Sequence, residues 1–231
     1  MNLRVVDDPA AVVAELLVDI ACAGGHVALA GGSTPRRAYQ IAAGQGQDLD
    51  ISAATLWLGD ERLVPADDER SNLRMVQETL VEPLPDERRP PVMPVDTRLS
   101  PDDAAVAYEA LLRERLGHHP RLDLVLLGLG SDGHTASLFP GKPAVQESHR
   151  LVAGVPEPGL EPLVPRVTLT LPAINTAREV VFLISGADKA AAVRRVFGDK
   201  PDLSAPAALV RPGAGTLTVV LDPPAAAELE P

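Results

Sequence analysis

The stretch LVLLGLGSDGHTASLFPG, residues 124–141, places a histidine directly after an apolar run and a series of glycines. Imidazole exchanges protons near neutral pH, because its unperturbed pKa is about 6.5. The glycines around His134 carry no side chain that would shield the ring, and Asp132 is close enough in sequence to orient it. Neighbours two positions apart on a loop need not touch, so the sequence leaves that contact open. We predict His134 as a general base, with Asp132 as the second catalytic residue.

The glycines at 128, 130 and 133 also fit the spacing G-x-G-x-x-G of dinucleotide-binding loops. Such a loop opens a long helix and is followed, after the next strand, by an acidic residue that binds the ribose. Here Phe139-Pro140-Gly141 limits any helix to about two turns, and no clean strand ending in an acid follows at 150–156. The segment therefore does not predict binding of NAD. A metal site is not predicted either, because Asp132 and His134 would need further ligands and the other four histidines lie in unrelated contexts. We expect no cofactor.

Ligands of open α/β sheets bind beyond the carboxyl ends of the strands. After the apolar run at 26–30 comes GGSTP, in which Gly31 and Gly32 allow close approach of a ligand to the backbone. Ser33 and Thr34 could cap the helix that follows, and its first N–H groups could hold a phosphate. The alternative is a plain turn with a capped helix.

Charged and polar side chains follow other strands, and each has a structural alternative. Asp60 and Arg62, in LGDER, could bind substrate or lie in a solvated turn, and Asn72 could bind substrate or belong to a helix cap. Arg166, in PRVTLT, could form an internal salt bridge or bind phosphate in a bidentate manner. Lys189, in GADK, could reach a bound anion or lie on the surface.

The elements that must position these residues alternate along the chain. Apolar runs rich in Val and Leu predict strands at 3–7, 26–31, 54–59, 123–128, 166–171, 179–185 and 216–221. Helical patterns lie between them at 9–23, 35–43, 70–81, 102–116 and 187–197. This alternation predicts an α/β fold with a mainly parallel sheet. The proline-rich segments at 83–94 and 156–165 are expected to be loops rather than linkers, so residues 1–231 are predicted to form a single domain.

The composition limits the classes of function. A formal charge of −11 argues against nucleic acid or an anionic membrane as the main partner, so an anionic substrate needs a local cluster of positive groups. The single cysteine, Cys22, permits no internal disulfide and is expected to be a small buried side chain. The amino terminus does not resemble a signal peptide, which favours a cytoplasmic location. We expect a monomer or a weak homodimer.

The motifs GGSTP, LGDER with SN ten residues later, LGLGSDGHTASLFPG, PRVTLT and SGADKA resemble those of the 6-phosphogluconolactonase family in order and spacing. The resemblance covers about residues 26–197. It implies a Rossmann-like sheet with helices on both faces, similar to the glucosamine-6-phosphate deaminase fold. It also implies hydrolysis of 6-phospho-D-glucono-1,5-lactone to 6-phospho-D-gluconate, a step of the oxidative pentose phosphate pathway. By resemblance His134 is the catalytic base, and Arg166, Lys189 and the Gly31–Thr34 loop hold the sugar phosphate.

Two other functions fit the same motifs. The related deaminases and isomerases carry a glutamate five positions after the histidine, for acid–base chemistry on an amino-sugar phosphate. Here that position is Phe139, which cannot carry a proton. A sugar-phosphate sensor without catalytic activity is the other alternative. For the lactonase, we expect backbone N–H groups of the Gly130–Gly133 loop to face the developing oxyanion.

Overall fold

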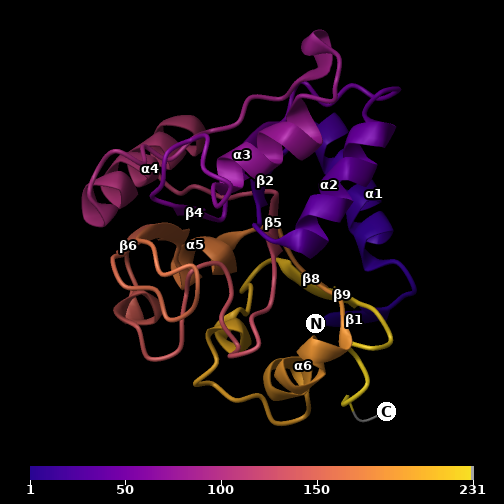
Figure 1. Ribbon diagram of the computed structural model, residues 1–231, viewed down its shortest axis with the longest axis vertical. Coiled ribbons are helices and arrows are strands. Elements are labelled where there is room, and N and C mark those ends of the chain that lie inside the picture. Colours follow the sequence, from indigo (N-terminus) through magenta and orange to yellow (C-terminus); the bar gives the residue numbers. More distant parts are fainter. Residues whose placement is uncertain (230–231) are drawn as a thin grey trace.

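A parallel sheet forms the centre of the computed structural model, which describes residues 1–229 (Figure 1). Its six strands lie in the order β1 (Asn2–Val5), β9 (Thr216–Leu221), β8 (Glu179–Ile184), β5 (Leu124–Leu127), β2 (His26–Leu29) and β3 (Thr55–Leu58). Every adjacent pair is parallel. The prediction of a mainly parallel α/β sheet is therefore confirmed, and six of the seven predicted strands lie in it.

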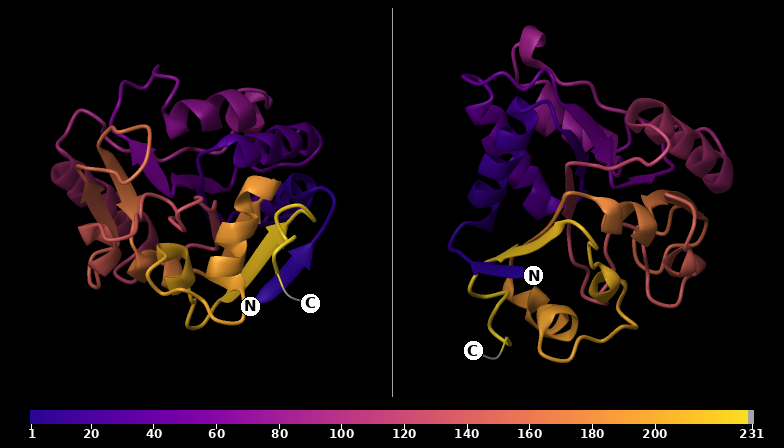
Figure 2. Two further views of the ribbon diagram at one scale, coloured as in Figure 1. Left: turned by 60° about the horizontal axis from the view of Figure 1, so that its bottom comes forward. Right: turned by 180° about the vertical axis from the view of Figure 1, so that it is seen from behind.

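Helices cover both faces of this sheet. On one face lie α1 (Pro9–Cys22), α2 (Ser33–Gln45) and α3 (Asn72–Val76), the last continued by the π-helix η1 (Gln77–Val81). On the other lie α4 (Pro101–Leu116), α5 (Leu171–Thr176) and α6 (Ala190–Phe197). Figure 2 shows β1 and β9 between the α1–α2 pair and α6. Val27 packs with the first group and Ala28 with the second, since successive strand residues face opposite sides.

A second, antiparallel sheet contains β4 (Asp60–Arg62), β7 (Arg166–Leu169) and β6 (Val152–Val155). It corrects the prediction for one strand. The strand predicted at 166–171 belongs to this sheet and stops at Leu169, because α5 begins two residues later. β6 lies within 150–156, but it pairs antiparallel and is followed by Pro156, so it is not the strand with a terminal acid that a dinucleotide fold requires. No helix follows His134 directly, and residues 131–142 form turns.

The connecting segments contain four short 3₁₀ helices: η2 (Asp86–Arg88), η3 (Pro143–Gln146), η4 (Ala187–Lys189) and η5 (Pro206–Leu209).

The prediction that Cys22 is buried is wrong. Cys22 is the last residue of α1, and its side chain is exposed. Within residues 1–229, no helix has the combination of length and hydropathy needed to cross a membrane.

The two tyrosines of the chain hold the carboxyl ends of two neighbouring strands. Tyr39 of α2 accepts a hydrogen bond from the N–H of Ala30 at 2.9 Å and donates to the same residue's carbonyl at 2.8 Å. Tyr108 of α4 approaches the strand ends from the opposite face and accepts from the N–H of Leu58 at 2.7 Å. Both side chains are buried. Ala30 and Leu58 directly precede the GGSTP and GDER segments, so each hydroxyl fixes the backbone from which one of these segments starts.

We predict that Tyr39→Phe and Tyr108→Phe each lower the free energy of unfolding by about 1–3 kcal/mol, because each leaves a buried backbone N–H unpaired while the ring still fills its space. Urea unfolding followed by circular dichroism measures the change. A loss below about 0.5 kcal/mol in both variants would contradict this role of the hydroxyls, since that is the range of neutral surface substitutions.

Candidate active site

The segments predicted to carry chemistry follow neighbouring strands of the parallel sheet. β5 lies between β8 and β2, and β3 is next to β2. The loop with His134, which follows β5, therefore has the GADK segment after β8 on one side and the GGSTP segment after β2 on the other. In a parallel sheet these strand ends meet at one edge, so the fold collects the segments there.

His134 and Asp132 are in direct contact. The Nδ1 atom of the ring lies 2.5 Å from Oδ1 of Asp132, and that oxygen also accepts the backbone N–H of His134 at 3.0 Å. A carboxylate only accepts hydrogen bonds, so Nδ1 is the donor in this contact, and in the neutral form of the ring Nε2 is then the nitrogen without a proton. Partial burial raises the pKa of Asp132, but the hydrogen bonds from His134 outweigh it and the net pKa is lowered. The carboxylate is therefore ionised at neutral pH.

The glycines of this loop are required by its tight path. A Cβ on Gly130 would overlap the His134 ring, and Gly133 has φ +83°, a region that side chains disfavour. The N–H of Gly130 donates to the carbonyl of His134 at 2.9 Å, and the N–H of Gly133 donates to the carbonyl of Gly130 at 2.9 Å. Both groups are thus used inside the loop. The expectation that they face an oxyanion is wrong for these two residues.

The carboxylate of Asp60 connects three strand ends. It accepts from Ser137 Oγ at 2.6 Å and from Asn72 Nδ2 at 3.1 Å, and the same amide donates to the Asp60 carbonyl at 2.8 Å. Gly31 packs so closely on the Asn72 amide that a Cβ there would overlap it. Asp60 is 7% exposed and Asn72 only 2%. Asp60 therefore does not lie in a solvated turn, and the cap of α3 is Ser71 rather than Asn72.

Arg62 and Arg166 lie opposite each other on the antiparallel strands β4 and β7, so both side chains are on the same face of the small sheet. Arg166 is 3% exposed; its Nη2 donates to the carbonyls of Leu160 at 3.1 Å and Pro162 at 2.8 Å. It forms no ion pair with a carboxylate among residues 1–229, so the structural alternative of an internal salt bridge is wrong. Burial lowers the pKa of Arg166, Asp60 opposes this, and Arg62 lowers it further.

The Nε atoms of these two arginines share an unusual property. In the described part of the chain they are the only buried side-chain nitrogen or oxygen atoms without a hydrogen-bond partner. A buried donor without a partner costs about 1–3 kcal/mol, so such groups call for an explanation. The small sheet therefore carries two neighbouring positive charges, each with one donor that no group of the described chain satisfies.

Phe139 separates the arginine from the histidine. Its ring centroid lies 4.7 Å from that of His134 and 5.2 Å from the guanidinium carbon of Arg166, and the side chain is fully buried. The fifth position after His134 is thus an apolar ring that packs against the imidazole. No proton can be exchanged there.

The GGSTP segment begins α2 without a side-chain cap. The N-cap is Gly32, with φ +112°, and neither Ser33 nor Thr34 caps the helix, so that part of the prediction is wrong. The first turn consequently keeps backbone N–H groups that no capping side chain satisfies. This is the arrangement that binds phosphate at helix N-termini.

Among the predicted site residues, Lys189 has the fewest contacts with the others. It is the N-cap of α6, its side chain is 28% exposed, and its Nζ lies 3.5 Å from Asp188. No hydrogen bond or ion pair links it to His134 or Arg166 within residues 1–229. Asp222 holds the start of the same loop, because its carboxylate accepts from Ser185 Oγ and from the N–H of Gly186.

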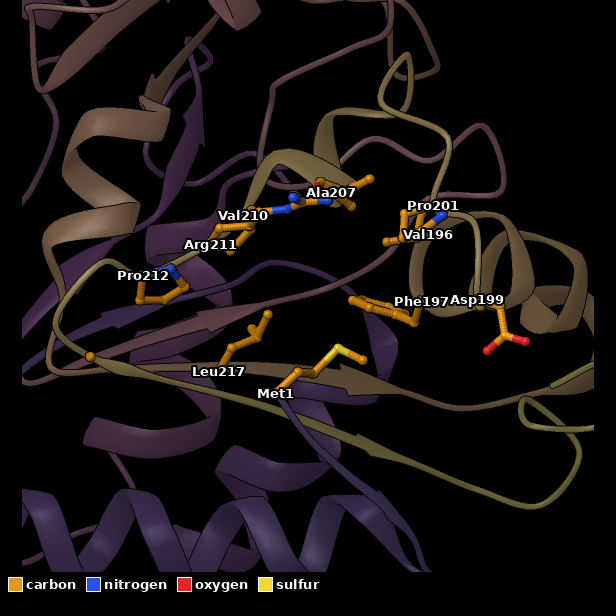
Figure 3. A pocket seen from close by; sticks show the side chains of 13 residues that line it. Met1, Val196, Phe197, Asp199, Pro201, Ala207, Val210, Arg211, Pro212 and Leu217 are labelled. Carbon is orange, nitrogen blue, oxygen red and sulfur yellow. Dashed lines mark hydrogen bonds between the residues drawn. The ribbon is translucent and has the colours of Figure 1, made fainter. Parts of the chain in front are cut away.

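A cavity of about 390 Å³ lies elsewhere, at the amino ends of β1 and β9 (Figure 3). Its lining includes Met1, Leu217 and Phe197 and none of the residues predicted for the site. The sequence prediction also omitted Ser137, which joins Asp60 to Arg166, and Arg195, which donates to the carbonyl of Asp132. Ser137 lies within the stretch 124–141 that contains His134, but its contacts are visible only once the loop is placed against β4 and β7.

Comparison with known proteins places the chain among related sequences and structures. Residues 5–219 match the family described as glucosamine-6-phosphate isomerases/6-phosphogluconolactonase. The chain is 38% identical over 213 residues to the 6-phosphogluconolactonase of Synechocystis, covering 90% of this chain and 85% of that protein. The structure of 6-phosphogluconolactonase from Trypanosoma cruzi superposes with a TM-score of 0.87 at 34% identity, covering 100% of this chain and 97% of that one.

The structure of a monomeric glucosamine-6-phosphate deaminase has a TM-score of 0.80 at 21% identity and covers 99% of this chain and 100% of that one. At this level of identity the likeness shows the fold alone, and it confirms the predicted fold class. Taken together, the match to the family and the identity to its curated relatives lead to one conclusion. The chain belongs to the glucosamine-6-phosphate isomerase/6-phosphogluconolactonase family.

Proposed function

We propose that the protein hydrolyses 6-phospho-D-glucono-1,5-lactone to 6-phospho-D-gluconate, the lactonase step of the oxidative pentose phosphate pathway. The relatives from Synechocystis and Trypanosoma cruzi, which match nearly the whole chain, carry the name of this enzyme. The observation that carries the proposal is the contact between Asp132 and His134, next to a phenylalanine where a deaminase has its glutamate.

His134 acts as the general base. Its unprotonated Nε2 takes a proton from a water molecule while the water oxygen attacks the lactone carbonyl carbon. The tetrahedral intermediate then collapses with cleavage of the bond to the ring oxygen, and the imidazolium returns its proton to that oxygen. Asp132 holds the ring and stabilises the imidazolium that forms between the two steps. A positioned base of this kind contributes about 10²–10⁴-fold to the rate.

The phosphate of the substrate requires positive groups away from the reacting carbon. The paired guanidinium groups of Arg62 and Arg166, with their unpartnered Nε atoms, support an anion site on the small sheet. The uncapped first turn at Ser33 and Thr34 supplies backbone donors, and Gly31 and Gly32 allow close approach. Lys189 contributes charge from the neighbouring strand end. Binding energy from the phosphate aligns the carbonyl carbon with the water.

Asp60 and Asn72 hold this arrangement together rather than exchange protons. Their hydrogen bonds link α3, β4 and the catalytic loop, and Gly31 of the GGSTP segment packs on the Asn72 amide. Both side chains are almost completely buried. The location in the cytoplasm, the state as monomer or weak homodimer, the lack of a nucleic-acid partner and the single domain over residues 1–231 stay predictions.

The direct test of the function is acid release from freshly prepared 6-phosphogluconolactone, corrected for its spontaneous hydrolysis. We expect rapid catalysed hydrolysis and no release of ammonia from glucosamine 6-phosphate. Ammonia release without lactone hydrolysis would assign the chain to the deaminases instead. Thermal stabilisation by 6-phosphogluconate with neither reaction would support a sensor.

We predict that His134→Ala lowers kcat by about 10²–10⁴-fold, because the variant lacks the base that activates water. The ring is at the edge of the core, so the fold should persist, and circular dichroism and thermal melting check this. His118→Ala is the matched control, since that histidine is exposed after the end of α4. Turnover of His134→Ala close to that of His118→Ala would refute the assignment of the base.

We predict that Arg166→Lys raises KM for the phosphorylated lactone by about tenfold, the equivalent of about 1.4 kcal/mol, because lysine lacks the fork that binds two phosphate oxygens. Comparison with unphosphorylated glucono-1,5-lactone isolates the effect, since only the phosphorylated substrate should be affected. Arg178→Lys is the control, because Arg178 is exposed and pairs with Asp123. An equal change for both substrates would remove Arg166 from the phosphate site.

A further inference from the structure

A segment near the carboxyl end of the chain contacts the catalytic loop from the side of α6. Arg195 of α6 donates from Nη1 to the carbonyl of Asp132 at 3.0 Å. Its Nε donates to the carboxylate of Asp202 at 2.7 Å, and its Nη2 donates to Ser204 Oγ at 3.1 Å. One guanidinium therefore links the helix, the backbone of the catalytic loop and the segment 202–204.

The same segment holds the next carbonyl of the loop. The N–H of Ala207 donates to the carbonyl of Gly133 at 3.0 Å. Gly133 also packs on Ala205 so closely that a Cβ at Gly133 would lie 2.6 Å from the Ala205 methyl group. Two consecutive carbonyls of the loop are thus bound from outside, one by a side chain and one by a backbone group.

We propose that Arg195 is a positioning residue for the catalytic pair, and that with residues 202–207 it fixes the peptide groups between Asp132 and His134. The carbonyl that Arg195 binds belongs to the residue whose carboxylate holds the His134 ring. Rotation of this peptide would move the carboxylate relative to the imidazole. A displacement of about 1 Å in a catalytic group can cost up to 10²-fold in rate. This inference rests on the proposed function of His134.

The surroundings of η5 show what else holds the segment 202–207 in place. Ala207 and Ala208 of η5 border the cavity of about 390 Å³, together with Val196 and Phe197 at the end of α6 (Figure 3). Both alanines are nevertheless almost completely buried, so η5 is held in place between this cavity and the catalytic loop. The hydrogen bonds of Arg195 to Asp202, Ser204 and the loop attach the segment that leads to η5 to α6 and to the carbonyl of Asp132.

The ion pair that anchors Arg195 persists at every pH at which the enzyme is expected to work. Hydrogen bonds from Ser204, together with those from Arg195, lower the pKa of Asp202 to about 2. Protonation therefore does not release the guanidinium near neutral pH.

The test compares Arg195→Ala with Arg194→Ala. Arg194 is the preceding residue of α6 but pairs with Glu228, away from the catalytic loop. We expect Arg195→Ala to lower kcat for the phosphorylated lactone by about 5- to 50-fold with KM within twofold. Arg195→Lys should recover part of the loss, because its ammonium can still donate to one carbonyl. Arg194→Ala should match the wild-type kcat.

A spectroscopic readout makes the result independent of the reaction. The proton between His134 Nδ1 and Asp132 should give a low-field imidazole resonance in the wild type, identified by its absence in His134→Ala. We expect this resonance to shift or broaden in Arg195→Ala and to be unchanged in Arg194→Ala. If lactone hydrolysis itself is absent, the proposed function fails, whereas an altered resonance still supports the positioning role.

Two results would overturn the inference: an unchanged resonance in folded Arg195→Ala, or a kcat equal to that of Arg194→Ala. If Arg195→Ala does not fold, Asp202→Asn provides the test, because it weakens one anchor of the guanidinium and keeps its shape. A wild-type resonance and kcat in Asp202→Asn would then contradict the proposal, and a change in both would support it.

Discussion

The hydrogen bond between the Asp132 carboxylate and Nδ1 of His134 is the interaction on which the proposed chemistry depends. It determines which ring nitrogen carries the proton, and so which nitrogen can accept one from water. The loop that makes the contact possible is unusually constrained. Gly130 must lack a side chain beside the ring, Gly133 adopts a positive φ, and the two glycine N–H groups are bonded within the loop. Phe139 closes the other side of the ring.

The sheet positions this loop by holding the strand ends around it. Tyr39 and Tyr108 fix the backbone at the ends of β2 and β3 from opposite faces of the sheet. Asp60 then joins the segments that follow these strands to the catalytic loop through Asn72 and Ser137. Rigid elements and buried hydrogen bonds of this kind restrict a catalytic group to a narrow range of positions. The site is consequently a property of the whole sheet edge rather than of the loop alone.

The sequence predicted what depends on local pattern. Most of the six parallel strands are nearly continuous apolar runs, and their alternation with helices specifies the fold class, which the structure confirms. The second sheet was not predicted, because β4 has only three residues, all charged, and is defined by its pairing with β7. The cap expected from Ser33 fails because Gly32 occupies the N-cap position. Arg195 contacts a residue 63 positions away, and no local pattern carries that information. The positions of site residues could be predicted where these residues follow the ends of strands. Their contacts could be seen only in the tertiary structure.

The central claim is that Asp132 keeps the proton of His134 on Nδ1 and leaves Nε2 free to activate water. Nitrogen-15 NMR of the histidine side chains, at a pH where His134 is neutral, measures the tautomer directly. We predict that Nδ1 of His134 has the chemical shift of a protonated nitrogen and that Nε2 has the chemical shift of an unprotonated one. The opposite tautomer in the wild-type protein would contradict it.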